Sequence, residues 1–297
     1  MQLGYNTNGL AHHDSFAAVA LLAEIGYQSV AITIDQHTLN PYRGDFHDQL
    51  QEMRALLAKH EMRSVIETGA RFLLDAHVKH EPTLVTADPA GRARRVDFYL
   101  HAIDAAKVLG SDCVSLWSGV LHDEAGDDEA WKRLTSSLQQ VIDYAAEQQV
   151  VIGFEPEPGM FIDTMGRFDE LLERVDAPYL QLTLDVGHLH CLGETPIAAQ
   201  IERYGHRLVN LHLEDMRAGV HEHLMFGEGE IDFPPVLDAL ARVGYAGGLH
   251  VELSRHSHDG PNAARRAYEF LQPFISLPRR AEDVSPLAAP REDLPGS

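Results

Sequence analysis

The chain alternates short runs of apolar, often β-branched residues with longer amphipathic stretches, and this alternation repeats eight times. Strands that alternate with helices in this way build a parallel sheet. Eight such units favour an α/β fold that closes into a (β/α)₈ (TIM) barrel over an open, doubly wound sheet. The predicted strands are Gln2–Asn6, Ser29–Asp35, Arg63–Glu67, Cys113–Trp117, Val150–Glu155, Leu180–Asp185, Leu208–Leu213 and Gly248–Leu253.

The predicted helices carry recurring end signals. Three of them close with a glycine, Gly26, Gly110 or Gly244, and a predicted strand follows each glycine within a few residues. Glycine at this place adopts the left-handed conformation that ends a helix, so the recurrence is typical of a repeated unit. The side chains expected to cap helix N-termini are those of Asp14, Asp127 and Thr164.

The length of the chain fits one domain. It has 297 residues, and α/β barrels routinely reach this size as a single unit. We expect the barrel to span residues 1–277 and a disordered tail, rich in Pro, Ala, Arg and acidic residues, to span 278–297. The long connection Thr68–Pro89 after the third strand is expected to be functional, because long loops in compact domains often are.

Composition excludes some classes of function. Since 45 acidic residues outweigh 24 Lys and Arg, the net charge of −21 repels phosphate backbones and makes a nucleic-acid partner unlikely on electrostatic grounds. No apolar run approaches the ~20 residues that span a bilayer, and the N-terminal segment has no signal-peptide pattern. Cys113 and Cys191 form no CxxC pair, so we expect two reduced thiols in a cytoplasmic protein.

Four consecutive predicted strands end in residues that can bind a metal ion. These are Glu155, Asp185, His212 and Glu252. In α/β barrels the active site lies at the carboxyl ends of the strands, so the four side chains should meet. Taken singly, each acidic residue could equally cap a helix or form a salt bridge. Three crowded carboxylates repel one another, however, and a divalent cation removes that conflict. We expect Mn²⁺, although the ligand set also suits Mg²⁺, Co²⁺ or Zn²⁺.

The motifs around these residues resemble the xylose isomerase-like barrel superfamily, which includes ketose 3-epimerases and the endonuclease IV family. The resemblance reaches to about residue 275. It rests on the order of FEPEPG (Phe154–Gly159), LDVGH (Leu184–His188), NLHLED (Asn210–Asp215), HEHLMFGEGEIDF (His221–Phe233) and HVEL (His250–Leu253) along the chain.

The resemblance implies roles for individual residues. Glu155, Asp185, His212 and Glu252 match the metal ligands of the superfamily, and the two glutamates match its proton-transfer pair. His188 and Arg217 match substrate contacts. The implied activity is that of a metal-dependent isomerase or epimerase of a small sugar, keto-sugar or polyol derivative, which acts through a cis-enediolate.

Other candidates for substrate binding come from the remaining strand ends. Asn6 closes the first strand, Glu67 the third and Trp117 the fourth, while Glu157 follows the fifth. Trp117 either stacks on a sugar or packs the rim of the barrel, and Glu157 either binds hydroxyl groups or forms a salt bridge. No clear phosphate-binding signature is present, so a sugar and a sugar phosphate both stay open.

The segment with His221 and His223 permits two interpretations. It resembles the Asp-Arg-His segment of the endonuclease IV family, so with His188 it could hold a second metal; we favour loop histidines that shape a sugar pocket. That endonuclease family also takes histidines from strands 2 and 3, where this chain has Glu67 and, in an uncertain register, His37. The alternatives are therefore a lyase or dehydratase on the same scaffold, a non-catalytic binding module and, with least support, a phosphodiesterase. Homo-oligomers are common among the relatives, but the sequence itself does not fix an oligomeric state.

Overall fold

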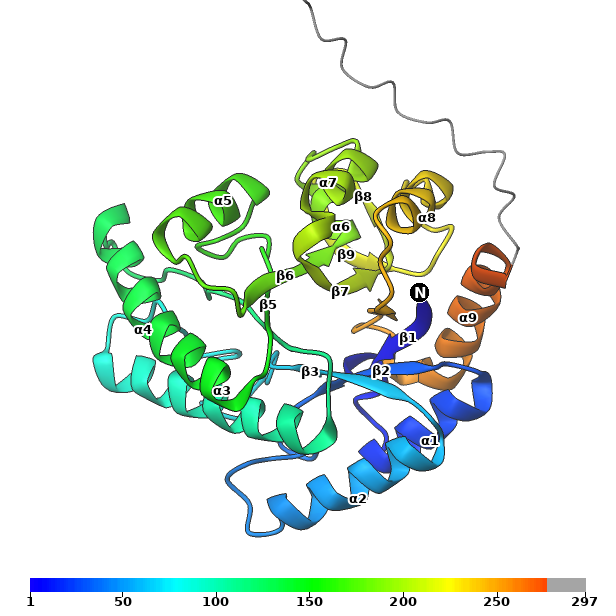
Figure 1. Ribbon diagram of the computed structural model, residues 1–297, viewed down its shortest axis with the longest axis horizontal. Coiled ribbons are helices and arrows are strands. Elements are labelled where there is room, and N and C mark those ends of the chain that lie inside the picture. Colours follow the sequence, from blue (N-terminus) through cyan, green and yellow to red (C-terminus); the bar gives the residue numbers. More distant parts are fainter. Residues whose placement is uncertain (277–297) are drawn as a thin grey trace, which may run out of the picture.

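The computed structural model describes residues 1–276 and shows the predicted barrel, with eight parallel strands closed in the order β1-β10-β7-β6-β5-β4-β3-β2 (Figure 1). The barrel strands are β1 (Gln2–Asn6), β2 (Ser29–Thr33), β3 (Arg63–Glu67), β4 (Val114–Leu116), β5 (Ile152–Phe154), β6 (Leu180–Asp185), β7 (Leu208–Leu213) and β10 (Gly248–Val251). A separate antiparallel hairpin, β8 (Asp215–Arg217) and β9 (Val220–Leu224), follows β7. The prediction of a single α/β barrel is confirmed.

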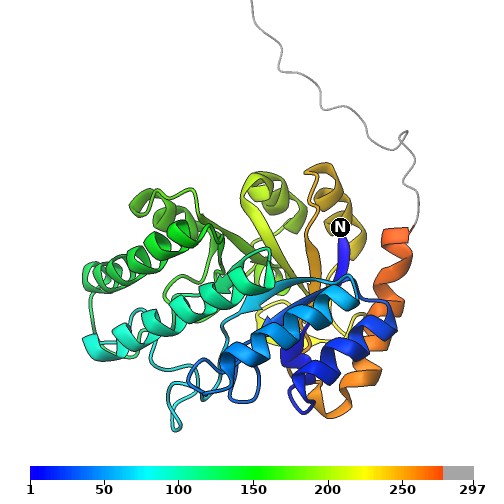
Figure 2. The same cartoon turned by 60° about the horizontal axis from the view of Figure 1, so that its bottom comes forward.

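Helices surround the barrel on its outside, as two views show (Figures 1 and 2). They are α1 (Ser15–Ile25), α2 (Phe46–Lys59), α3 (Pro89–Leu109), α4 (Asp127–Gln148), α5 (Met165–Arg174), α6 (Val186–Cys191), α7 (Ile197–Tyr204), α8 (Phe233–Arg242) and α9 (Gly260–Ser276), with short 3₁₀ turns η1 (Thr7–Leu10), η2 (Gly205–Arg207) and η3 (Ser257–Asp259). None of the helices within residues 1–276 is both long and apolar enough to cross a membrane.

The helix ends mostly follow the sequence signals. Asp14 and Thr164 accept backbone N–H bonds as N-caps of α1 and α5. Gly26 and Gly110 adopt φ of 118° and 69° where α1 and α3 end. The expectation for Asp127 is wrong by one position. Gly126 is the N-cap of α4, and Asp127 is the first helical residue. The negative charge of Asp127 is stabilised there by the positive end of the helix dipole, and its carboxylate forms an ion pair with Arg167.

Four barrel strands are shorter than predicted at their carboxyl ends. β5 ends at Phe154 and β10 at Val251, so Glu155 and Glu252 lie one residue beyond the ladder. The apolar pattern continues past the last paired residue because the chain still packs against the barrel, and pairing stops as the strands open toward the mouth. Each glutamate keeps one backbone bond to a neighbouring strand: Glu155 N–H donates to Leu116 and Glu252 N–H to Leu213.

The interior of the barrel is polar near its axis. The buried ring of His250 lies where a Cβ on Gly4 or Gly248 would collide with it, so these two glycines make room for the imidazole. The long connection Thr68–Pro89 runs from β3 to α3 without regular structure between residues 68 and 88. The predicted tail, 278–297, lies outside the described residues.

Candidate metal centre and substrate cavity

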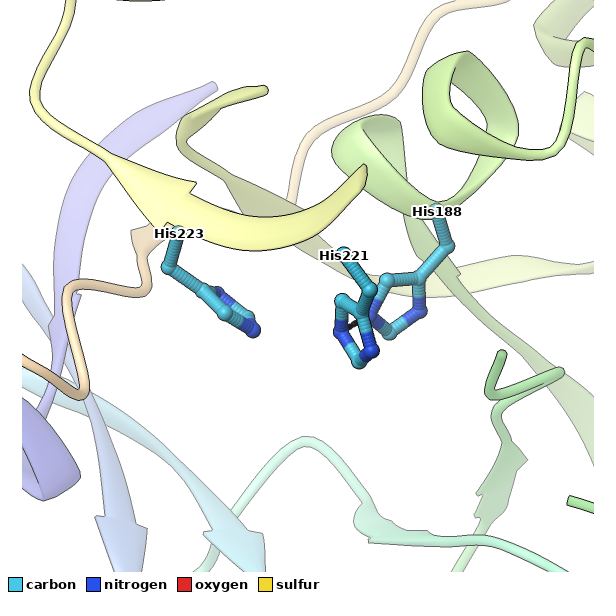
Figure 3. Close-up of side chains that lie close together, drawn as sticks. All are labelled: His188, His221 and His223. Atoms are coloured by element: carbon cyan, nitrogen blue, oxygen red, sulfur yellow. Dashed lines mark hydrogen bonds between the residues drawn. The ribbon is translucent and has the colours of Figure 1, made fainter. Parts of the chain in front are cut away.

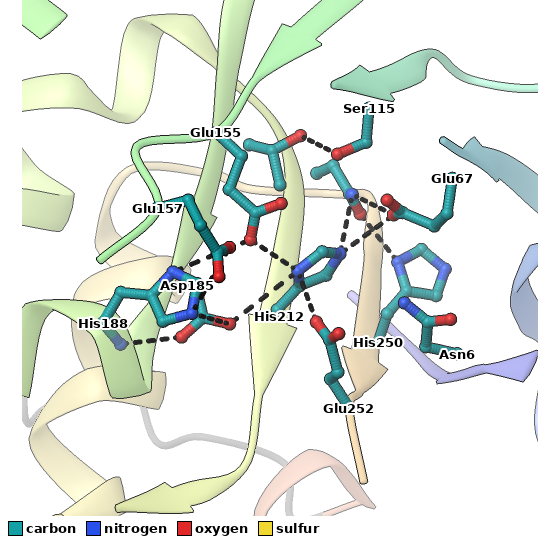
Figure 4. A network of polar contacts seen from close by, with 12 residues as sticks. Asn6, Glu67, Ser115, Glu155, Glu157, Asp185, His188, His212, His250 and Glu252 are labelled. Atoms are coloured by element: carbon teal, nitrogen blue, oxygen red, sulfur yellow. Dashed lines mark hydrogen bonds and ion pairs between the residues drawn. The ribbon is translucent and has the colours of Figure 1, made fainter. Parts of the chain in front are cut away.

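Glu155, Asp185, His212 and Glu252 meet at the mouth of the barrel, as their strand positions predict. One ligand atom from each lies within 4.8 Å of the other three. The Nδ1 atom of His212 is 3.0 Å from Glu155 Oε1, 2.9 Å from Glu252 Oε2 and 3.8 Å from Asp185 Oδ2 (Figure 4). A single ring nitrogen thus faces three carboxylates, and one proton cannot satisfy them all.

Asp185 combines two functions through its two oxygens. It is the N-cap of α6, and its Oδ1 accepts the backbone N–H of His188 at 2.8 Å. Its Oδ2 is buried and has no hydrogen-bond partner within residues 1–276. A buried carboxylate oxygen without a partner is costly, so this atom is suited to a cation. The helix-capping alternative and the metal-ligand prediction for Asp185 are therefore compatible.

The other nitrogen of His212 has a partner of its own. His212 Nε2 is 2.9 Å from Glu67 Oε1. An ionised carboxylate only accepts hydrogen bonds, so Nε2 carries a proton toward Glu67. Nδ1 is the nitrogen left to face the three carboxylates, and it is the atom that would bind a cation there. Glu67 in turn accepts a bond from the amide of Asn210, whose oxygen contacts His250 Nδ1 at 2.8 Å. Glu67, a substrate-binding candidate from the sequence, therefore supports His212 directly.

The crowding also changes how the carboxyl groups ionise. Burial raises the pKa of Glu155 to about 8, although the charge of His212 acts to lower it. Burial acts to raise the pKa of Glu252 as well, but the charge of His212 and its hydrogen bond outweigh burial and lower that pKa. Without a bound cation, these neighbouring carboxyl groups would repel one another if all of them were ionised. The donor set, the unpartnered Asp185 oxygen and this conflict together fit a divalent cation.

A cavity of about 240 Å³ opens beside the four residues. Of the sequence candidates, Asn6, Glu67, Trp117, Glu155, Glu157, His212, His221, His223 and Glu252 line it. Asp185 and His188 are not among the lining residues, although Asp185 belongs to the four-residue cluster and His188 Nδ1 lies 3.8 Å from Glu155 Oε1. The cavity wall also includes residues that the motifs did not single out, namely Thr33, Gly69, His80, Met160, Ser254 and Arg255. Ser254 and Arg255 directly follow the HVEL motif, and His80 belongs to the long connection. Their positions along the chain are therefore the sequence signal that could have identified them as cavity residues.

Three histidines, His188, His221 and His223, lie close together (Figure 3). His188, on α6, lies 3.1 Å from His221 through their Nε2 atoms, and its Nδ1 is 3.3 Å from the carbonyl oxygen of Pro156. His221 and His223 both come from β9, and ligand nitrogens of the three rings lie within 4.8 Å of one another. Glu157 is close to the same group, 3.7 Å from His188 and 3.8 Å from His221. This geometry suits either a hydrogen-bonded wall of the cavity or a second cation.

A buried carboxylate holds the hairpin that carries two of these histidines. Asp215, at the start of β8, accepts four backbone N–H bonds of 2.8–3.1 Å, from Met216, Gly227, Gly229 and Ile231. The segment after β9 is thereby tied to the end of β7. A Cβ on Gly229 would collide with the Asp215 carboxylate, so this close approach requires glycine.

A buried arginine side chain holds the part of the cavity wall that includes His80 and Trp117. Arg95, on α3, is fully buried and donates to the carbonyl oxygens of His80 and Pro82, both at 2.6 Å. Its guanidinium also lies 5.1 Å from the ring centre of Trp117. His80 meets the same indole edge-on, with ring centres 5.5 Å apart. Trp117 thus lines the cavity and packs the rim at the same time, so its two sequence-based interpretations are compatible.

A family model described as a xylose isomerase-like TIM barrel matches residues 19–274. The chain belongs to this family. Among curated proteins, it is 24% identical over 246 residues to the L-ribulose-5-phosphate 3-epimerase UlaE of Salmonella paratyphi A, which covers 82% of this chain and 83% of that protein.

Solved structures of other proteins share the fold. A D-allulose 3-epimerase from Methylomonas sp., in complex with D-allulose, superposes with a TM-score of 0.73 at 22% identity and covers 92% of this chain and 96% of that one. The IolI protein with a bound zinc atom gives a TM-score of 0.75 at 18% identity, over 93% of this chain and all of that one. At these identities the likeness establishes the barrel alone.

The structure does not bring Arg217, a substrate-binding candidate from the sequence, to the cavity. Its side chain is exposed and donates to the carbonyl oxygen of Glu228 at 3.0 Å, and it is not among the residues that line the cavity. The β8–β9 turn carries it outward. His37 contributes to none of the groups that could bind a metal within residues 1–276 and lines a different cavity.

Proposed function

We propose that this protein is a metal-dependent epimerase or isomerase of a small sugar, keto-sugar or polyol derivative, in which Glu155 and Glu252 form the proton-transfer pair. The observation behind the proposal is that both carboxylates lie within 3.0 Å of one nitrogen of His212 and both line one cavity. The names of the relatives, a ribulose-phosphate 3-epimerase and an allulose 3-epimerase, support the same reaction class.

One divalent cation, Mn²⁺, is proposed to be held by Glu155, Asp185, His212 and Glu252. The carboxylate-rich donor set favours a hard cation, and the zinc of the IolI structure shows that a relative with this fold binds a divalent ion. When bound, the cation would supply the Lewis acidity that makes a C–H bond beside a carbonyl more acidic. Loading with Mn²⁺ is expected to give about one equivalent per chain by elemental analysis, and the histidine group is expected to add no second one.

The residues of the chain then move the proton. One glutamate removes the proton beside the carbonyl as a general base, which gives a cis-enediolate, and the other returns a proton. Asn8 donates its side-chain amide to Glu252 Oε1 at 2.7 Å, which fixes the orientation of that carboxylate. Proton transfer by a placed carboxylate typically contributes about 10²–10⁴-fold in rate.

Two separate carboxylates favour epimerisation over isomerisation. Return of the proton to the opposite face of the same carbon needs a second acid, whereas transfer to a neighbouring carbon on one face needs one group only. The polar wall formed by Glu157 and His221, which His188 supports through its contact with His221, is proposed to bind the substrate hydroxyl groups. A lyase reaction would start from the same enediolate, and a change in product mass would reveal it.

The test is solvent exchange. The protein would be incubated with Mn²⁺ and a broad panel of ketoses and ketose phosphates in D₂O, and deuterium beside the carbonyl would be followed by NMR. Incorporation with inverted configuration at that carbon is the expected result. No incorporation with any member of the panel would contradict the proposal.

A cytoplasmic location is also proposed. Cys113 and Cys191 are both buried and free, as expected for a reducing compartment.

A further inference from the structure

A second cavity adjoins the proposed substrate cavity. Its volume is about 250 Å³, close to the 240 Å³ of the first. Asn8, Thr33 and Arg71 line both, so the two spaces meet at these three residues. Asn8 connects them chemically as well, because its side-chain amide donates to Glu252 while its backbone carbonyl accepts from Arg71 at 3.1 Å. The second cavity therefore adjoins the proposed substrate cavity across Asn8.

Hydrogen-bonding groups without partners gather around the second cavity. Within the described residues, Asn8 Oδ1, His13 Nδ1 and Ser15 Oγ are buried without any hydrogen-bond partner, and all three residues line this space. Unsatisfied buried polar atoms cost about 1–3 kcal/mol each. All three atoms belong to side chains that border one cavity, so a rotation of these side chains would present donors and acceptors to a polar ligand there.

The remaining lining fits a sugar ring better than a phosphate group. The formally charged residues that line the cavity are Asp35 and Arg71, whose side chains lie 3.6 Å apart, so their charges offset each other. A phosphate site would need uncompensated positive charge. Phe72 adds an aromatic side chain that is 44% exposed, a large apolar surface on which the C–H face of a sugar can pack.

Size points in the same direction. Each cavity alone is smaller than the ~300–1,000 Å³ typical of pockets for larger small molecules, whereas the two together fall within that range. We propose that the protein acts on a substrate of two sugar units, with the reacting unit at Glu155 and Glu252 and the second unit in the cavity between Asn8, Ser15 and Phe72. The assignment of the reacting unit rests on the proposed function; the second subsite rests on the cavity.

The experiment compares affinities for one and two sugar units. Binding of D-fructose and of four glucosyl-fructoses that differ in linkage (turanose, maltulose, leucrose and isomaltulose) would be measured by calorimetry on the full chain with Mn²⁺. Ala11 is exposed and lines the second cavity only, so Ala11→Trp fills that space and Ala11→Ser is its matched control. Circular dichroism would confirm that both variants fold.

We expect at least one disaccharide to bind about tenfold more tightly than D-fructose, which corresponds to about 1.4 kcal/mol. Ala11→Trp should abolish this preference and Ala11→Ser should keep it, while Phe72→Ala should reduce it severalfold. Equal affinity for one and two units across the panel, or an unchanged preference in Ala11→Trp, would overturn the proposal.

Deuterium exchange on the same sugars separates this proposal from the function on which it builds. Disaccharides that bind in the Ala11-dependent way, with no exchange on any sugar of either panel, would support the subsite and reject the epimerase. Exchange on monosaccharides with no gain from a second unit would support the epimerase and reject the subsite.

Discussion

The two halves of the barrel mouth differ in how they present side chains. Strands β5, β6, β7 and β10 are neighbours in the barrel, and each of the four proposed metal ligands lies within one residue of the end of one of these strands. On the other half, most of the cavity wall comes from connections, such as Asn8 after β1 and the long segment after β3. Groups that must meet a reacting atom need the fixed backbone of a strand, whereas groups that recognise the rest of a substrate can come from loops.

The largest effect is expected from the strand-borne half. Glu155→Gln and Glu252→Gln keep the size of the side chain but remove its ability to accept a proton. Each should reduce deuterium exchange on the active ketose by about 10²–10⁴-fold. Glu147→Gln on the exposed face of α4 is the matched control and should change nothing. Full activity in both site variants would instead favour a non-catalytic binding module.

A smaller effect is expected from Glu67, which belongs to β3 but supports His212 across the barrel. Glu67→Gln replaces an obligate acceptor with an amide that can also donate, so the Nε2 tautomer of His212 is no longer enforced. Loss of such a supporting partner typically weakens metal affinity by about 10–100-fold. Calorimetric titration with Mn²⁺ checks this, with Glu52→Gln on the exposed face of α2 as control. An unchanged affinity for Mn²⁺ in Glu67→Gln would mean that only residues from the half formed by β5, β6, β7 and β10 contribute to metal binding.

The difference between the halves also explains what the sequence could predict. Asp185 and His212 lie on strands whose bounds follow from the apolar pattern, so their meeting at the mouth follows from barrel topology. His80 and Phe72 lie on a connection without regular structure, and its path depends on long-range contacts such as the bonds from Arg95 to the carbonyls of His80 and Pro82. No local pattern encodes such contacts, so the sequence indicated only that this connection is functional.

The β8–β9 hairpin after β7 lies outside the barrel, yet the hydrogen bonds of Asp215 fix its position. It therefore tests whether a segment outside the barrel strands can hold side chains in place. Asp215→Asn keeps the shape of the side chain but turns an amide toward backbone N–H groups that need an acceptor. We expect a loss of about 1–3 kcal/mol in the free energy of unfolding, measured with urea. Asp176→Asn, an exposed control, should stay within about 0.5 kcal/mol. If both variants are equally stable, Asp215 does not organise the segment that carries His221 and His223.

The smallest effect is expected at Arg217, where the family resemblance and the geometry disagree. The resemblance assigns a substrate contact, but the structure turns the side chain outward onto the Glu228 carbonyl. If the geometry holds, Arg217→Ala changes kcat/KM by no more than about twofold, as expected for a surface position. Arg255→Ala is the informative comparison, because Arg255 lines the cavity and its loss should raise KM. A large rise in KM for Arg217→Ala would mean that the β8–β9 turn closes over the substrate. This turn would then move during substrate binding, in contrast to the fixed ends of β5, β6, β7 and β10.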